Sequence, residues 1–151
     1  MANTQAMCTS FKSEILTGTH NFGVAPTRGS TAADSFKAAL YLASATVNAT
    51  TTAYSASNEV SGTNYTAGGV AVTNATVPTT SGTTAYWTPS ASITYTNVTL
   101  STAFDAVLIY NSTQSNKAVS VHTFGSQTVT AGTFSLTMPT NGAGTALLNI
   151  A

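Results

Sequence analysis

Residues 102–139 read TAFDAVLIYNSTQSNKAVSVHTFGSQTVTAGTFSLTMP, and this stretch decides the fold class. β-Branched and aromatic residues fill three runs of strand length within it, at residues 104–111, 118–124 and 133–138. Clusters of Asn, Ser, Gln and Gly separate the runs and favour turns. The stretch therefore predicts three consecutive antiparallel strands, a β-meander.

The first run, residues 104–111, is apolar on nearly both of its faces. Its alternation places Phe104 and Leu108 on one face and Val107 and Ile109 on the other. A strand with two apolar faces has to be covered on both sides. We therefore expect this strand to be central in its sheet, covered by a second sheet or by the N-terminal segment.

Short runs with alternating apolar residues also occur on both sides of this stretch. They predict further strands at residues 35–43, 70–77, 84–88, 93–100 and 145–150. Residues 45–66 lack an apolar period and are rich in Thr, Ser and Asn, so a long loop is expected there. Many short strands divided by turn signals are typical of an all-β fold, here an antiparallel β-sandwich or a jelly-roll-like fold.

Helical periodicity is confined to residues 3–18. Met7, Phe11 and Ile15 recur every four positions, and Gly18 follows where a helix C-terminal cap is expected. This pattern predicts one short amphipathic helix, which has to dock its apolar stripe on another surface because a helix of this length is marginal alone.

The chain divides into two parts by composition. Residues 19–34 are rich in Gly, Pro, Ser and Thr and predict a connecting arm after the helix. Alternating apolar patterns begin only at residue 35. We therefore expect an N-terminal helix and arm at residues 1–34 and a β-sandwich domain at residues 35–151.

Charge is almost absent from the chain. Its 151 residues include four basic and four acidic residues, so the formal net charge is zero, and 31 threonines supply much of the polar surface. Four scattered basic residues cannot neutralise a run of phosphates, so no nucleic-acid partner is expected. No run approaches the roughly 20 apolar residues of a membrane span, and the first residues lack the layout of a signal peptide, so no membrane partner is expected.

No arrangement of residues predicts catalysis or a cofactor. Asp105, His122 and a serine make a Ser-His-Asp set only on paper, because the chain has no Gly-x-Ser-x-Gly elbow. The carboxylates are distant from one another in sequence, so a glycosidase pair of Asp105 with Glu59 is a minor alternative. His20 and His122 are the only histidines and have no third ligand at metal-site spacing. We therefore expect no enzyme, no catalytic residue, no metal site and no cofactor.

Five segments together resemble a family of small proteins encoded among the virion structural genes of tailed bacteriophages and prophages. They are MANTQAMCTSFKSEILTGTHNF (1–22), SFKAALYLASAT (35–46), SNEVSGTNYTAGGVAVTN (57–74), AVLIYNST (106–113) and KAVSVHTFGSQTVTAGTFSLTMPT (117–140). The resemblance spans nearly the whole chain, but none of the segments is a catalytic signature. It implies a structural protein of the virion and assigns no functional residue.

Within this class, the first expectation is a capsid decoration or cement protein that binds the major capsid protein lattice, or other virion proteins, and stabilises the head. The alternatives are a head-tail connector, a tail component, and a receptor- or glycan-binding appendage, for which Tyr65, Tyr86 and Trp87 are candidates for a sugar-binding face. We expect a homo-oligomer, a dimer or trimer, at local symmetry axes. The expected location is the capsid surface, after synthesis in the cytoplasm of the host bacterium.

The attachment surface is expected on the N-terminal helix and arm. Its candidate residues are Met7, Phe11, Ile15, Leu16 and Phe22. If the sandwich closes on itself without the helix, this apolar stripe is free to dock in a groove of a partner. The alternative is that the helix caps an open end of its own sandwich.

Overall fold

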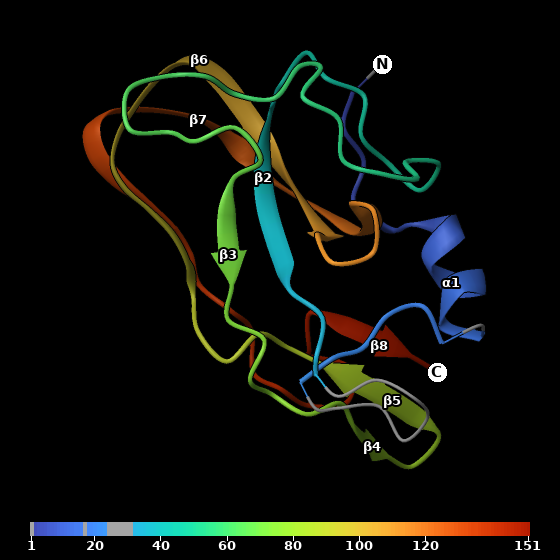
Figure 1. The fold of residues 1–151 in the computed structure, drawn as a ribbon. Helices are drawn as coiled ribbons and strands as arrows, with labels where there is room; N and C mark the ends of the chain where they lie inside the picture. The colour runs from blue at the N-terminus through green and yellow to red at the C-terminus, as the bar shows by residue number, and fades with distance from the viewer. Residues whose placement is uncertain (1, 17, 24–31) are drawn as a thin grey trace.

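The computed structural model describes residues 2–16, 18–23 and 32–151. Its elements are β1 (Ala6–Met7), α1 (Thr9–Leu16), β2 (Phe36–Leu42), β3 (Val70–Val72), β4 (Thr79–Ser81), β5 (Thr84–Trp87), β6 (Ile93–Asn111), β7 (Lys117–Leu136) and β8 (Leu148–Ile150). All strand pairs are antiparallel, in two sheets with the orders β1-β7-β6-β2-β3 and β4-β5-β8 (Figure 1). The expected all-β class with one short helix is confirmed, whereas the jelly-roll variant is not confirmed by these strand orders.

Strands β6 and β7 form one long hairpin, so the predicted three-stranded meander is wrong. They contain 19 and 20 residues. Each merges two predicted runs: residues 93–100 with 104–111, and residues 118–124 with 133–138. Residues 125–132, which include two Gly and two Thr, continue the ladder, with Val129 opposite Leu100 and Gln127 opposite Phe104. The turn-forming residues in this segment therefore do not reverse the chain.

Those residues instead accommodate irregularities within the hairpin. The ladder shifts register repeatedly between Tyr95 and Ala106, and Asn97 and Ala131 adopt φ values of 51° and 44°. A bulge of this kind bends a strand and increases its twist without ending it. Figure 1 shows the two strands curving together at the left of the view. The gap predicted after residue 111 is a true turn, which joins β6 to β7 at residues 112–116. The gap at residues 125–132 marks a bend within β7 instead.

The central position expected for residues 104–111 is confirmed, because β6 lies between β7 and β2. On one face of the sheet, Tyr54 of the loop after β2 stacks on Tyr110, with ring centroids 4.8 Å apart. On the opposite face, Phe22 of the N-terminal segment stacks on Phe36 at 4.5 Å and contacts Trp87 of β5 at 4.7 Å. The second sheet and the N-terminal segment thus cover one face, and the loop covers the other.

The predicted helix at residues 3–18 is shorter in the structure, spanning Thr9–Leu16. Residues Ala6–Met7 pair with the edge of β7 instead. In the first turn of a helix their backbone N–H groups would have no partner within the helix, whereas the edge of β7 offers hydrogen-bond partners to them. The cap is confirmed: Gly18 has a φ of 68°, and its amide donates to the carbonyl of Ile15 at 3.1 Å.

The N-terminal segment shares the core of the β-domain. Cys8 and Phe11 belong to the same buried cluster as side chains of β2 and β6. The division predicted after residue 34 therefore separates two sequence patterns rather than two cores. Residues 24–31 of the predicted arm lie outside the described residues, and on either side of them Asp34 and Asn21 exchange two hydrogen bonds of 3.0 Å.

The remaining loops and strands agree only in part with those predicted from the sequence. The long loop expected at residues 45–66 is confirmed, since it contains only isolated bridges to β2, β6 and β7. The strand expected at residues 70–77 ends after Val72, and β4 forms between this segment and the next expected strand, where no strand was predicted. The closing strand expected at residues 145–150 is β8, which pairs with β5.

Candidate interaction site

Two of the five residues predicted to form the attachment surface, Phe11 and Phe22, pack inside the chain. Phe11 is 1% exposed, and its ring lies 4.8 Å from that of His20 and 6.0 Å from that of Phe22. Phe22 is half-buried against β2 and β5. With these rings the N-terminal segment covers its own sandwich, which is the alternative that the sequence left open.

Two others, Met7 and Ile15, line an open groove between α1 and β8. The groove has a volume of about 510 Å³ and is lined by Met7, Lys12, Ile15, Asn149, Ile150 and Ala151. Ile15 is 36% exposed and Ile150 44% exposed, so the groove contains two of the three large exposed apolar side chains that the structure describes, the third being Val77. The side chain of Leu16, the fifth predicted residue, lies outside the described residues.

Strand β8 contributes a free edge to this groove. It is the outermost strand of its sheet, paired with β5 on one side only. The groove lies on the α1 side of β8, because α1 supplies its other wall and no residue of β5 lines it. In Figure 1, β8 lies between β5 and α1. The sequence predicted a strand here but carried no signal that its edge would be free, since pairing with β5 depends on the assembled sheet.

Among the described residues that line the groove, Lys12 alone has a charged side chain, and it is exposed. The ion pairs found in the described part of the chain join Glu14 to His20 and to Lys117, so Lys12 takes part in neither. The described residues that line the groove include no acidic side chain. The site is therefore an apolar groove with one unpaired cation beside an unpaired strand edge.

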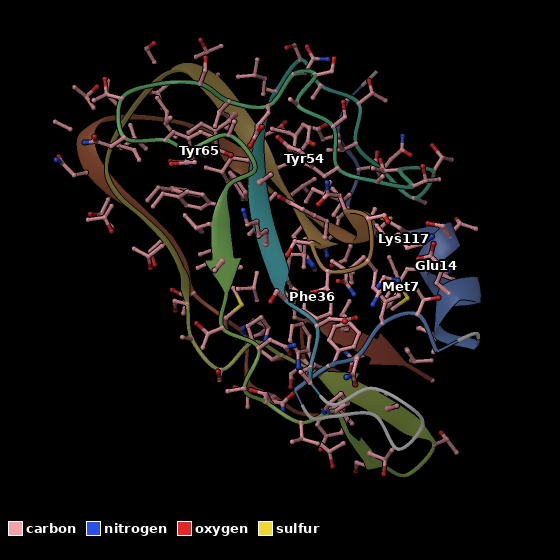
Figure 2. The ribbon with its side chains drawn as sticks, in the orientation of Figure 1. Met7, Glu14, Phe36, Tyr54, Tyr65 and Lys117 are labelled. Carbon is pink, nitrogen blue, oxygen red and sulfur yellow. The ribbon has the colours of Figure 1, made fainter. Side chains whose placement is uncertain are left out.

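A polar cluster, which we call the Glu14 clasp (Glu14, His20, Asn111 and Lys117), fixes the position of α1. Glu14 accepts a hydrogen bond from Lys117 Nζ at 2.5 Å, and its second oxygen lies 2.7 Å from His20 Nε2. His20 Nδ1 lies 3.1 Å from Asn111 Nδ2, which also donates to Asp34 at 2.7 Å. Figure 2 shows Glu14 and Lys117 next to each other, to the right of the hairpin turn. The clasp thus joins one wall of the groove to the β6–β7 hairpin.

The clasp favours the ionised form of Glu14. Burial by itself raises the pKa of this carboxyl group, but the hydrogen bonds from Lys117 and His20, together with the charges of these two side chains, outweigh burial and lower the pKa below its ordinary value of 4.5. Glu14 therefore stays a charged acceptor at neutral pH and holds α1 in place.

A second polar cluster closes the long loop on itself around Glu59. Tyr54 and Tyr65 each donate a phenolic hydrogen bond of 2.7 Å to the carboxylate, and the amide of Gly68 donates a third of 2.8 Å (Figure 2). Burial, followed by the hydrogen bond to Glu59, raises the pKa of both tyrosines, so they remain donors. Tyr110 then donates to the carbonyl of Gly68 at 2.8 Å and anchors the loop to β6.

The residues considered for catalysis have separate structural partners. Asp105 accepts a hydrogen bond from Asn3 at 2.5 Å, whereas His122 Nε2 lies 2.9 Å from the hydroxyl of Ser120. Burial lowers the pKa of His122 to about 4, so its imidazole is neutral at physiological pH. Neither residue lines the groove. Asp105 and His122 therefore do not form part of a nucleophile–base pair at an accessible substrate site.

The aromatic residues considered for sugar binding are largely engaged within the chain. Trp87 is 3% exposed, and its indole nitrogen donates to the carbonyl of Thr76 at 2.9 Å. Tyr65 is bound to Glu59, and Tyr86 is half-buried. These three rings do not form an open face, so the groove at α1 and β8 is the stronger candidate site.

Neither a group of metal-ligating side chains nor a membrane-spanning helix is found among the described residues. No group of three or more His, Cys, Asp or Glu side chains suited to a metal ion occurs in the part of the chain that the structure describes. No helix among residues 2–16, 18–23 and 32–151 is long and apolar enough to cross a membrane. Comparison with known proteins finds no matching family model, no matching curated protein and no matching solved structure.

Proposed function

We propose that this chain is a non-enzymatic structural protein of a bacteriophage virion, a capsid decoration protein that binds the major capsid protein lattice and stabilises the head. The observation that carries the proposal is the groove of Ile15 and Ile150 on an almost uncharged chain. Exposed apolar grooves are typical of protein interaction sites. The five sequence segments resemble virion structural proteins, and this resemblance indicates that the partner is another protein of the virion.

The polar clusters support a structural role in preference to an enzymatic one. The Glu14 clasp and the Glu59 cluster use their carboxylates to hold α1 and the long loop. A catalytic acid or base has to reach a substrate within hydrogen-bond distance. Glu14, Glu59 and His122 are all outside the lining of the groove, so binding is the activity that the geometry favours.

The test is decoration of purified heads assembled without this chain. Heads are mixed with the full chain, bound copies are counted, and the temperature of head disruption is measured with and without the protein. A decoration protein follows the symmetry of the shell, so we expect on the order of hundreds of copies per head and a higher disruption temperature. A control with bovine serum albumin accounts for adsorption.

Other outcomes of this experiment would identify one of the alternative functions. About a dozen copies or fewer, located at one vertex, would indicate a connector or tail component, in line with the lower symmetry order of that position. Binding to host cells without binding to heads would indicate a receptor-binding appendage. Absence of binding to heads would overturn the decoration proposal.

A further inference from the structure

We infer that the groove between α1 and β8 receives an extended segment of the partner, which adds to the free edge of β8 as a further strand and carries a carboxylate that meets Lys12. The inference rests on the proposed function, in which that partner is the major capsid protein. It assigns a backbone conformation, a side-chain pattern and a charge to the segment, and each of these comes from a different feature of the groove.

The extended conformation follows from the edge of β8. An edge strand presents unpaired backbone donors and acceptors, and proteins usually protect such an edge by keeping the strand very short or with a charge, a proline, a bulge or a covering segment. Strand β8 has three residues, so an added strand would make only a few backbone hydrogen bonds with it. The residues of β8 are Leu148, Asn149 and Ile150, which include neither a charge nor a proline. Addition of a strand to such an edge is a recurring mode of peptide recognition, in which backbone hydrogen bonds supply affinity.

The apolar pattern follows from the lining of the groove. Met7 and Ile15 form one wall and Ile150 projects from β8. Side chains of an extended segment alternate in direction, so those on one side enter the groove and the others point to solvent. A volume of about 510 Å³ accommodates a few apolar side chains. The matching segment therefore has apolar residues at alternate positions.

The carboxylate follows from Lys12. This lysine is exposed at the groove and lies outside the ion pairs that the structure describes, so an acidic side chain of the segment would complement it. A second copy of this chain is a poorer occupant, because it would bring a second Lys12 and no acidic side chain from its own groove. The one carboxylate of α1, Glu14, already binds His20 and Lys117.

Binding is tested with the full chain and short overlapping peptides that tile the major capsid protein, by fluorescence polarisation. We expect binding by a peptide that has alternating apolar residues and an Asp or Glu. Ile15→Asp and Ile150→Asp place a carboxylate in the groove and should weaken this binding about tenfold or more each. Val77→Asp makes the same change at the exposed apolar residue outside the groove and should weaken it less than about twofold.

Two further measurements test the addition of a strand to β8 and the contact of the peptide's carboxylate with Lys12. Hydrogen exchange should show amide protection at Leu148–Ile150 when the peptide binds, because strand addition engages the free edge. Lys12→Glu should weaken binding, and replacing the acidic residue of the peptide by Lys should restore it in this variant alone. All variants are first compared by circular dichroism and thermal unfolding, so that a folding defect is recognised.

The same variants on heads separate the two proposals. If the wild-type chain decorates heads and Ile150→Asp decorates them equally well, the groove inference fails and the decoration function stands. If no tiled peptide binds, if Val77→Asp weakens binding as much as Ile150→Asp does, or if the groove variants dissolve a homo-oligomer, the inference also fails. If the wild-type chain does not bind heads, the proposed function fails.

Discussion

At the scale of single residues, the four acidic side chains of the chain hold its segments together. Glu14 joins α1 to Lys117, Asp34 joins the N-terminal segment to Asn111, and Asp105 binds Asn3, in each case across a long stretch of sequence. Glu59 binds three donors within its own loop. Hydrogen bonds to charged groups are about twice as strong as neutral ones, so a chain with few charges gains most from them at such positions.

The apolar core offers the most direct test of residue burial. Leu108 is 0% exposed in the central strand β6, and Leu108→Ala should lower the free energy of unfolding by about 2 to 5 kcal/mol through lost burial and a residual cavity. Val77→Ala is the control, because Val77 is 52% exposed, and should change it by less than about 0.5 kcal/mol. Denaturant titration measures both, and equal values would contradict the assigned core.

His122 should make stability depend on pH. Burial lowers its pKa from 6.5 to about 4 in the folded chain, so between these values the unfolded chain binds the additional proton. The free energy of unfolding should therefore fall as pH decreases through this window, by about 3 kcal/mol in all. The lowered pKa of Glu14 adds a further loss below pH 4.5. Denaturant titrations at pH 7, 5.5, 4.5 and 3.5 measure the effect.

The control for this pH dependence is His122→Gln, which cannot titrate. It should remove most of the decrease between pH 6.5 and 4.5 and leave the loss associated with Glu14 at lower pH. An unchanged pH profile in the variant would show that His122 is not the group responsible.

At the scale of elements, the helix α1 ends because of backbone conformation at Gly18. Its φ is 68°, and a β-carbon added there would meet no atom within 4 Å. Gly18→Ala should therefore lower the free energy of unfolding by about 1 kcal/mol through left-handed strain alone. Thermal unfolding followed by circular dichroism at 218 nm measures the change.

Gly125 of β7 is the matched control for this prediction. A β-carbon there also meets no atom within 4 Å, but its φ lies outside the left-handed range. Gly125→Ala should be neutral or raise the free energy of unfolding by up to about 1 kcal/mol, because alanine has less conformational freedom in the unfolded chain. Destabilisation by both substitutions would argue against a conformational cap at Gly18.

At the scale of the whole molecule, the N-terminal segment is part of the folded unit. It supplies Cys8 and Phe11 to the core, stacks Phe22 on Phe36, and adds β1 to the edge of β7. The groove wall formed by α1 is thus held by the same contacts that complete the core. A change in this segment therefore affects both stability and the candidate site.

Deletion of residues 1–33 should abolish cooperative unfolding. Removing a buried phenylalanine such as Phe11 alone costs about 3 to 5 kcal/mol, and the deletion also removes Cys8, Phe22 and the Glu14 clasp. Differential scanning calorimetry should show no sharp transition for the truncated chain. A truncated chain that unfolds cooperatively near the wild-type temperature would support the division into an arm and an independent domain.

Local patterns by themselves determined the all-β class, the apolar central strand, the long loop and the cap at Gly18. Alternation, turn composition and φ preference act within a few residues, so the sequence carries them directly. The tertiary structure alone decided that residues 125–132 continue a strand, that Phe11 faces inward while Ile15 faces a groove, and that Ile150 meets α1 across an unpaired edge. These features depend on pairing and packing partners far away in sequence, which a local pattern does not specify.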